Sequence, residues 1–331
     1  MSSLVPAISQ ASCHELYFGL ITVGALLVSV IIFQRASADP EHELRRTHSH
    51  IGLSQSESNL RDQYSPAHQP KLGQPPRLQS LLIYPVKSCQ GIELTRSRVL
   101  PTGLEFDRLY TFAQLRERRE DDEDPTWEFL TQRQLPLLAS VKVGLWLPKT
   151  GGTAGKPGAT SGGFLAVRFP WKRPGLTGLL QWTLAKLQQG PYSSPEKVFM
   201  LPLDFPSQDD IARRGYEYAN VRIWKETTTA LNMASEVPVE LRQYLGLKNR
   251  LGLFRMDPSR QREVFRCAPR KEVAGYQPVV DFHDAYPLHL LSLSSLQDFD
   301  SKVEKDQIIR ALDARRFRAN IIGNASLRID A

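Results

Sequence analysis

The chain has 331 residues, and its 42 Lys and Arg residues against 35 Asp and Glu residues give a formal net charge of +7. Hydrophobic residues make up 41% and charged residues 23%, which excludes a collagen, a coiled-coil rod and a wholly disordered chain. The length allows two domains or one large β-rich domain. Because residues 1–79 carry six basic and six acidic residues, the positive excess lies in residues 80–331. Such an excess is compatible with phosphate-bearing ligands but does not establish them.

The three cysteines, Cys13, Cys89 and Cys267, are widely spaced. They form neither a disulfide framework nor a CxxC metal motif, so the chain fits a reducing compartment. Cys267 has basic neighbours in VFRCAPRKE that could make its thiol reactive. No candidate base lies near it in the sequence, so we expect a structural thiol.

Residues 16–33 (LYFGLITVGALLVSVIIF) are eighteen residues without a charge. As a helix they would span about 27 Å, and they predict a single-pass membrane anchor. Arg35, Arg45 and Arg46 follow this segment and no basic residue precedes it, which predicts that the body faces the cytosol. A cleaved signal peptide is the alternative, since residues 36–38 (ASA) resemble a cleavage site. Residues 1–15 contain no Lys or Arg, and the apolar run is longer than that of a normal signal peptide. Both features favour a retained anchor.

Residues 34–76 are rich in Ser, Gln, His and Pro, a composition that predicts a disordered linker. His48 and His50 form an HxH pair within it that could touch a metal ion. No carboxylate or thiol cluster completes such a site, so we interpret both histidines as solvated linker residues.

The body of the protein begins at residue 78. Apolar patterns predict short strands over residues 78–86, 92–100, 104–115, 164–169, 221–226, 251–256 and 315–322, and a turn or short helix leading into a strand over 128–147. Short strands with tight turns favour a meander or barrel over a βαβ sheet. Helices are predicted over residues 176–189, 237–247 and 305–314, with a strand passing into a helix over 285–299.

Two segments between strands are expected to be loops. Residues 116–124 (RERREDDED) are nearly all charged, and residues 150–163 are rich in glycine. The second segment is not a P-loop, because Thr150 and Pro157 stand where that motif needs Gly and then Ser or Thr.

Two features of the predicted helices concern packing and capping. The helix over residues 176–189 carries leucines at helical spacing, which predicts packing rather than function, at Leu176, Leu179, Leu180, Leu184 and Leu187. The region from Ser292 to Ser295 is a natural helix N-cap with open amide donors.

The sequence contains no self-contained catalytic motif. No GxSxG, HExxH, GxGxxG or kinase signature occurs in a supporting context. His283 and His289 are each expected to be a satisfied core group rather than a ligand. Lys and Arg at turns beside backbone N–H groups can hold phosphate without a P-loop, and such residues stand at strand ends here, namely Lys87, Ser88, Arg108 and the arginines of 315–318. On composition alone, plain surface charge at hairpin ends is the stronger alternative.

Two segments, YPVKSCQGIEL at 84–94 and GLEFDR at 103–108, resemble the opening of the MOSC amino-terminal β-barrel domain. Two later segments resemble the first half of the MOSC domain itself, namely YQPVVDFHDAYPLHLLSLSSL at 276–296 and RRFRANI at 315–321. The usual family sequence in the second of these segments is Phe-Arg-Pro-Asn. The family includes the mitochondrial amidoxime-reducing component and the carboxyl-terminal part of molybdenum cofactor sulfurase. The matches stand in order and span residues 78–322.

The resemblance implies a mainly β fold with helices (α+β). The implied organisation is an amino-terminal tail at 1–15, the transmembrane anchor at 16–33, the disordered linker at 34–76, a MOSC N-terminal β-barrel domain at 77–256 and a partial MOSC β-barrel domain at 257–331.

The resemblance also implies that the protein binds the molybdenum cofactor, a molybdopterin. The implied cofactor-binding residues come from both domains and are Lys87, Ser88, Arg108, Asp284, Ser292, Arg318 and Asn320. The lysine, the serine and the first arginine would grip the phosphate and the pterin edge. The second arginine and the asparagine would hold the ligand from the second domain, and the segment 284–292 would line the pocket with backbone donors.

The sequence departs from the family pattern in two ways. Ala319 stands where the family usually has Pro. After Ile322 the chain runs GNASLRIDA to Ala331, where the MOSC domain is about half built, so the resemblance implies a C-terminally truncated domain. The other half carries the cysteine whose thiolate binds molybdenum, and neither Cys89 nor Cys267 stands in the matching context, so the catalytic and metal-ligating residues are unknown.

For a complete domain the family implies reduction of N-hydroxylated substrates at molybdenum. Electrons would come from a b-type cytochrome and its NADH-dependent reductase, and the anchor is similar to that of the outer mitochondrial membrane members. No nucleic-acid partner is expected. Three alternatives stay open: a non-catalytic cofactor-binding remnant or scaffold, a sulfur-transferring relative that would need an added pyridoxal-phosphate domain, and an unstable product without function.

Overall fold

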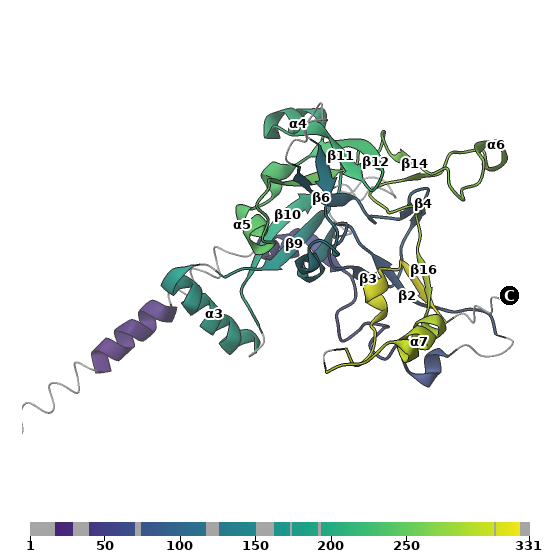
Figure 1. Cartoon of the computed structure of the whole chain (residues 1–331). Coiled ribbons are helices and arrows are strands. Elements are labelled where there is room, and N and C mark those ends of the chain that lie inside the picture. Colours follow the sequence, from purple (N-terminus) through teal and green to yellow (C-terminus); the bar gives the residue numbers. More distant parts are fainter. Residues whose placement is uncertain are drawn as a thin grey trace, which may run out of the picture. The chain divides into compact units, whose positions relative to one another are not determined.

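The computed structural model describes residues 17–28, 40–69, 74–116, 126–149, 162–172, 174–190, 193–307 and 309–324 (Figure 1). The chain divides into two compact units, Met1–Arg46 and Thr47–Ala331. The predicted loops over residues 116–124 and 150–163 lie almost entirely outside the described residues.

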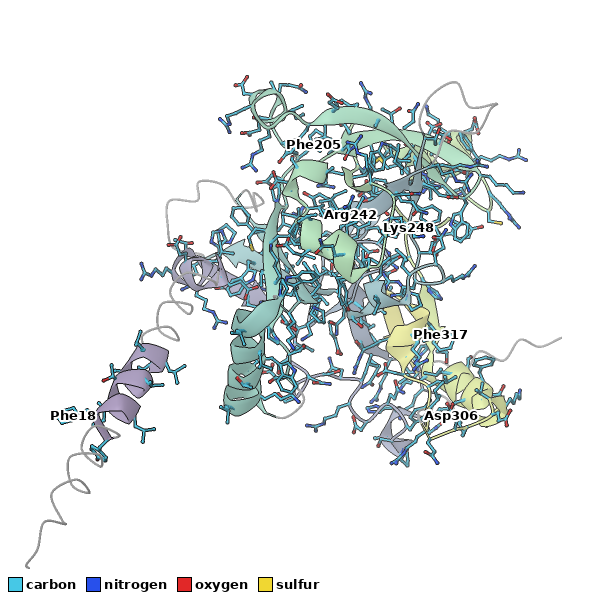
Figure 2. The ribbon with its side chains drawn as sticks, turned by 60° about the vertical axis from the view of Figure 1, so that its left-hand side comes forward. Phe18, Phe205, Arg242, Lys248, Asp306 and Phe317 are labelled. Carbon is cyan, nitrogen blue, oxygen red and sulfur yellow. The ribbon has the colours of Figure 1, made fainter. Side chains whose placement is uncertain are left out.

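The first unit contains a helix over residues 17–28, from which apolar side chains such as Phe18 project (Figure 2). The predicted anchor, residues 16–33, extends beyond the described part of this helix at both ends. Among the residues that the structure describes, no helix has both the length and the apolar character needed to cross a membrane. Helix α2 (Pro40–Thr47) has acidic residues in its first turn and basic residues in its last, which complements the helix dipole.

A closed barrel of five strands lies in the second unit. Its strand order is β11-β12-β13-β6-β7, with bounds Glu217–Ile223, Glu226–Asn232, Leu251–Arg255, Tyr110–Leu115 and Trp127–Phe129. Closure pairs the strands all round and leaves no open edge. The predicted mixture of strands and helices with a β-barrel is therefore confirmed.

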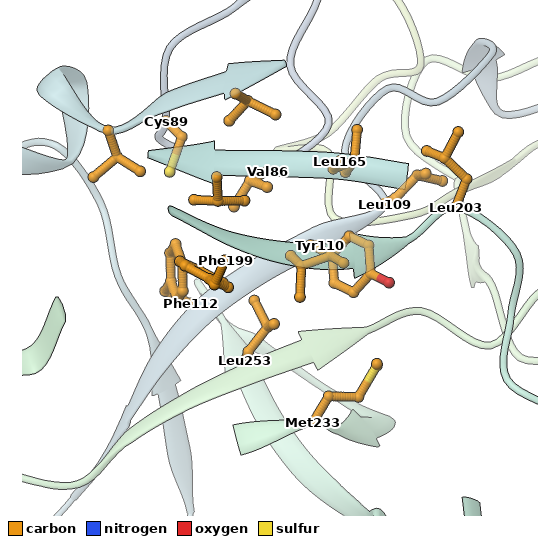
Figure 3. Close-up of a cluster of buried hydrophobic side chains, with 14 of the residues drawn as sticks. Val86, Cys89, Leu109, Tyr110, Phe112, Leu165, Phe199, Leu203, Met233 and Leu253 are labelled. Atoms are coloured by element: carbon orange, nitrogen blue, oxygen red, sulfur yellow. The ribbon is translucent and has the colours of Figure 1, made fainter. Parts of the chain in front are cut away.

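An antiparallel sheet of four strands packs its apolar side chains into the same core as the barrel. Its order is β1-β8-β9-β10, with bounds His48–Ile51, Lys142–Pro148, Phe164–Pro170 and Glu196–Pro202. Figure 3 shows this core, where Val86, Cys89, Tyr110 and Phe112 lie among leucines from several strands. Helix α5 (Val239–Tyr244) covers part of the sheet through the rings of Tyr244 and Phe169, whose centroids are 5.6 Å apart.

The amino-terminal residues of the second unit are structured, in contrast to the prediction of a disordered linker. Strand β1, which contains His48 and His50, pairs along β8. Leu60 is buried, and the Gln63 side chain donates to the carbonyl of Leu312 and accepts from the N–H of Ala314. The disordered-linker prediction is wrong for residues 48–69, because polar side chains in this segment satisfy backbone groups far along the chain.

A second four-stranded sheet has the order β16-β17-β2-β3, with bounds Leu290–Ser292, Ile321–Gly323, Leu78–Ile83 and Ile92–Leu94. Strand β17 runs parallel to β16 and antiparallel to β2. The sheet joins strands from both sides of the predicted boundary between residues 256 and 257, so the two predicted domains share it. Ser292 is the N-cap of α7 (Leu293–Lys302), as expected, although its side chain makes no capping hydrogen bond.

The remaining elements are four two-residue strands, three α-helices and four 3-10 turns of the described chain. The strands are β4 (Val99–Leu100), β5 (Gly103–Leu104), β14 (Arg262–Glu263) and β15 (Val279–Val280). The helices are α3 (Gly175–Gln189), α4 (Gln208–Arg214) and α6 (Lys271–Ala274), with 3-10 turns at η1 (Pro66–His68), η2 (Pro136–Ser140), η3 (Ala234–Glu236) and η4 (Ala314–Phe317).

Four predicted strands are interrupted. The strand expected over 92–100 divides into β3 and β4, with no strand at residues 95–98. The strand expected over 104–115 begins only at Tyr110, because residues 105–108 form a turn. The strand expected over 221–226 contains the hairpin between β11 and β12, at Trp224 and Lys225. The segment 315–322 passes from η4 into β17 rather than forming one strand.

The helix predicted over residues 305–314 does not form in the described residues. Helix α7 ends at Lys302, and the next residue, Val303, is extended. The Asp300 carboxylate accepts from the N–H of Leu312 at 2.7 Å and pairs with Lys305. These contacts draw the chain back toward α7, so a tertiary interaction overrides the helical pattern.

Helix α3 forms close to its predicted range, but three of its leucines, Leu176, Leu179 and Leu187, do not pack as expected. Leu176 and Leu187 are 80% and 83% exposed, and Leu179 is 48% exposed, whereas Gly178 is buried. At these positions the helix places a small residue inward and large apolar residues outward.

This contrast between leucines gives a test of the packing. Leu145→Ala, in the core, is expected to lower the free energy of unfolding by about 2–5 kcal/mol, because it leaves a cavity among packed side chains. Leu187→Ala on α3 is expected to change it by no more than about 0.5 kcal/mol. Urea unfolding followed by circular dichroism measures both. Equal losses in the two variants would show that Leu187 is packed in solution.

Candidate functional site

A buried carboxylate, Asp107, joins four segments of the chain. Its Oδ1 accepts from the N–H of Tyr84 at 2.6 Å and from Arg108 at 2.5 Å. Its Oδ2 accepts from Asn320 Nδ2 at 2.9 Å and lies 3.1 Å from His283 Nε2. Burial alone would raise the pKa of Asp107, but the charge of Arg108 and the hydrogen bond from His283 outweigh it and lower the pKa to about 2.

The aromatic ring of Tyr84 supports two guanidinium groups. The Cζ atoms of Arg108 and Arg318 each lie 4.3 Å from the centroid of this ring. Arg108 also donates to the backbone carbonyl of Arg318 at 3.2 Å, and Arg318 donates to that of Cys89 at 2.6 Å. A Cβ at Gly91 would stand 2.5 Å from the Tyr84 ring, so only glycine fits there. The two arginines are thus fixed side by side by stacking and by backbone carbonyls.

Arg318 carries hydrogen-bonding capacity that the described residues do not use. Its buried Nη2 has no hydrogen-bond partner among them, and its Nη1 donates to a backbone carbonyl rather than to a carboxylate. Burial, followed by the charge of Arg108, lowers the pKa of Arg318 to about 10, so it stays protonated at neutral pH. A buried donor without an acceptor costs about 1–3 kcal/mol. Its position beside Arg108 therefore suits an external anion.

Two further buried atoms near Asp107 lack partners within the described part of the chain, the hydroxyl of Tyr84 and the Nδ1 of His283. Burial raises the pKa of Tyr84 to about 12, against the opposing charges of Arg318 and Arg108, so the hydroxyl is neutral. Native proteins leave few such groups unsatisfied, and each one calls for an explanation such as a bound ligand, an ion or an ordered water.

Lys87 lies buried near this cluster. Its Nζ donates at 2.8 Å to the carbonyl of Phe282 and at 2.8 Å to Asp284 Oδ1. Desolvation lowers the pKa of Lys87 to about 8, although the charge of Asp284 acts in the opposite direction. Its charge therefore changes within a range of pH that is easily reached.

Several residues with positive φ, an unfavourable backbone conformation, lie at or next to this cluster. Six non-glycine residues of the described chain have positive φ, and they are Ser88, Phe106, Arg108, Trp224, Cys267 and Arg318. Three of them are residues that the resemblance implies, and Trp224 touches a fourth, Asp284, at 2.9 Å. Positive φ is unfavourable for such side chains and tends to occur at binding sites, where the surroundings hold it in place.

Five of the seven residues implied by the resemblance come together. Lys87 contacts Asp284, Arg108 contacts the backbone of Arg318, and Asn320 shares Asp107 with Arg108. These contacts join the turn after β2, the turn before β6, the loop before β16 and the residues before β17.

The two serines behave differently from the other implied residues. The hydroxyl of Ser88 donates to the carbonyl of Leu130 at 3.1 Å. This hydrogen bond stabilises the turn that contains Lys87 and Ser88. Ser292 pairs in register with Gly323, three residues beyond Asn320 along β17, and its hydroxyl lies 2.8 Å from that of Ser294.

Sequence reasoning gave no role to Asp107, Tyr84 and Trp224. Asp107 stands beside Arg108 in GLEFDR, but nothing in that pattern shows that it is buried. Tyr84 opens the segment YPVKSCQGIEL, and Trp224 lay within a predicted strand. His283 is buried, and its Nε2 is hydrogen-bonded to Asp107. For this nitrogen, the expectation that the histidine is a core group with its hydrogen bonds satisfied agrees with the structure.

The described cysteines do not supply a metal-binding thiolate. Cys89 is buried in the hydrophobic core, where desolvation raises its pKa to about 12 despite the charge of Arg318. Cys267 is exposed, on the segment that precedes α6. Across the described ranges, no group of three or more His, Cys, Asp and Glu side chains could hold a metal ion.

Residues 75–159 match the family model of the MOSC N-terminal beta barrel domain. The match supports a MOSC domain protein, and MOSC domains are associated with binding of the molybdenum cofactor. It includes Lys87, Ser88, Asp107 and Arg108. No curated protein matches the chain.

The buried carboxylate makes stability depend on acid. The pKa of Asp107 is about 2 in the folded chain against 3.8 ordinarily, so its ionisation contributes about 2 kcal/mol above pH 4, and this is lost as the pH falls through 2. Asp107→Asn is expected to lose that contribution and to flatten the dependence of the unfolding free energy on pH between 4 and 2. Chemical unfolding at a series of pH values measures it.

The control is Asp298→Asn, at an exposed carboxylate paired with Lys302. It should keep the wild-type slope. A wild-type profile without a fall in stability below pH 4 would contradict the role of Asp107, whether or not Asp107→Asn folds.

Proposed function

We propose that this protein binds the molybdenum cofactor, with Arg108 and Arg318 receiving its phosphate. The observation that carries the proposal is Arg318 itself, a strained residue whose partly buried guanidinium has a fully buried Nη2 without a partner among the described residues. Arg108 is neutralised by Asp107 and Lys87 by Asp284, whereas the described contacts of Arg318 include no carboxylate. One positive charge therefore remains for a ligand, and a guanidinium fork matches phosphate oxygens.

The residues present fit the phosphate of that cofactor and do not fit its metal. Molybdenum needs a soft thiolate ligand, and the side chain of Cys89 belongs to the core while Cys267 is on an exposed segment. Support for the ligand assignment comes from the buried cations and from the match at residues 75–159. Binding without catalysis is therefore the function that the described side chains favour.

An oxidoreductase role is the finer part of the proposal and rests on the resemblance. In that role the protein reduces N-hydroxylated substrates, a b-type cytochrome with its NADH-dependent reductase supplies electrons, and a thiolate other than Cys89 or Cys267 ligates molybdenum. The bound cofactor would supply the redox chemistry, and this chain would orient its phosphate. A single-pass anchor at residues 16–33, in the mitochondrial outer membrane with the body facing the cytosol, completes this proposal.

Removal of the arginine tests binding directly. Arg318→Ala is expected to weaken binding of inorganic phosphate by about 10-fold to 100-fold, because charge-assisted hydrogen bonds contribute about 1.5–3 kcal/mol. It should also lower the pterin content of the purified protein. Titration calorimetry measures the first, and fluorescence of the released, oxidised pterin measures the second.

Arg213→Ala, at an arginine of α4 whose side chain is 70% exposed, is the matched control and should leave both values unchanged. Equal phosphate affinity in Arg318→Ala and wild type would contradict the proposed site.

Anion affinity is also expected to depend on Lys87. Because the pKa of Lys87 is about 8, the lysine loses its charge as the pH rises through that value, and the affinity for an anion should fall there. Sulfate is the suitable probe, since its own charge is constant over this range. Calorimetry from pH 6 to pH 9, where Arg318 stays mostly protonated, should show the fall in wild type and its absence in Lys87→Met. A flat wild-type profile would exclude Lys87 from the site.

A further inference from the structure

The ion pair between Lys87 and Asp284 is unequal in its surroundings. The Lys87 side chain is 6% exposed, whereas that of Asp284 is 69% exposed. Lys87 is also held by its backbone N–H, which donates to the carbonyl of Tyr110 at 2.8 Å. Asp284 stands in an exposed stretch with Ala285 and Tyr286. A fixed, buried cation is therefore capped from the solvent side by a carboxylate on an exposed segment.

A second donor points at the same oxygen. The indole N–H of Trp224 donates to Asp284 Oδ1 at 2.9 Å, alongside the Lys87 ammonium at 2.8 Å. Trp224 lies at the tip of the hairpin between β11 and β12, with φ of 56°. Its ring packs against Phe129 with centroids 5.1 Å apart, and Phe129 lies 5.5 Å from Lys87 Nζ. Phe129 thus holds both donors in place.

The two donors define a position for one anionic oxygen. Lys87 comes from the turn after β2, Trp224 comes from a distant hairpin, and both are placed by contacts that do not involve Asp284. An ammonium and an indole N–H that converge on one oxygen bind a phosphate or sulfate oxygen as well as a carboxylate oxygen.

We infer that Asp284 occupies an oxyanion position formed by Lys87 and Trp224, and that it must leave this position when an anionic ligand binds. Asp284 is then an internal competitor that sets the affinity of the site, rather than a ligand-holding residue as the resemblance implies. The inference rests on the proposed function, since Lys87 and Arg108 are close enough for their charges to interact. Once displaced, the exposed carboxylate returns to water at little cost.

A supporting role for Asp284 would predict the opposite effect on anion binding. If Asp284 served mainly to keep Lys87 protonated, its removal would weaken anion binding. The charge of Asp284 does favour the protonated lysine, so the sign of the effect separates the two roles.

The test is phosphate binding by the full chain at pH 7, measured by titration calorimetry with inorganic phosphate. Asp284→Asn is expected to tighten binding by about tenfold, because the neutral amide no longer competes for Lys87. Asp298→Asn is the matched control, an exposed carboxylate whose ion pair lies on α7, and it should leave the affinity unchanged. Circular dichroism melts establish that each variant is folded.

A second variant tests the indole. Asp284→Asn combined with Trp224→Phe is expected to bind phosphate about fivefold more weakly than Asp284→Asn alone, because phenylalanine keeps an aromatic ring and lacks the N–H donor. An unchanged affinity would remove Trp224 from the position.

The outcomes separate this inference from the proposed function. Phosphate binding that Arg318→Ala weakens but Asp284→Asn leaves unchanged or weakens overturns the role of Asp284 and leaves the proposed site standing. Absence of phosphate binding by wild type and Asp284→Asn alike overturns both.

Discussion

The arrangement of the site depends on the burial of a single carboxylate. Asp107 has no exposed side-chain surface, and an ionised carboxyl in that position is tolerated only when its oxygens are fully paired. Its partners come from the end of β2, the turn before β6, the loop before β16 and the start of β17. Four segments far apart in the sequence therefore have to meet correctly before Arg108 and Arg318 can lie together.

The same constraint explains the balance of charge. Asp107 neutralises Arg108 and fixes its guanidinium over Tyr84, so Arg318 stacks on that ring beside a cation that already has its partner. Lys87 has a partner that is mostly in water, and Arg318 is held by a backbone carbonyl. The charge of Arg108 is thus the most completely paired, that of Lys87 is less so, and that of Arg318 is the least. This order follows from what each cation contacts and not from its residue type.

The sequence predicted the features that depend on local pattern. Apolar segments bounded by turns predicted β2, β8, β9 and β13, and the basic residues expected at strand ends, Lys87, Arg108 and Arg318, lie in turns next to strands. Sequence patterns did not predict the features that are determined by contacts between residues far apart in the chain. The burial of Asp107 requires Asn320 and His283, the order in residues 48–69 requires β8 and Leu312, and the break after Lys302 requires Asp300. Each depends on a pairing over many residues that periodicity cannot reveal.

Cys89 shows why binding and redox chemistry have to be argued separately. Its carbonyl accepts from Arg318 and so belongs to the proposed anion site, while its side chain belongs to the hydrophobic core. Burial raises the pKa of this thiol to about 12, which keeps it protonated and unsuited to a metal ion. The turn that follows β2 therefore supplies the site with backbone and charge alone. Metal ligation, where it occurs, is a property of other residues, and the geometry around Arg318 neither needs it nor provides it.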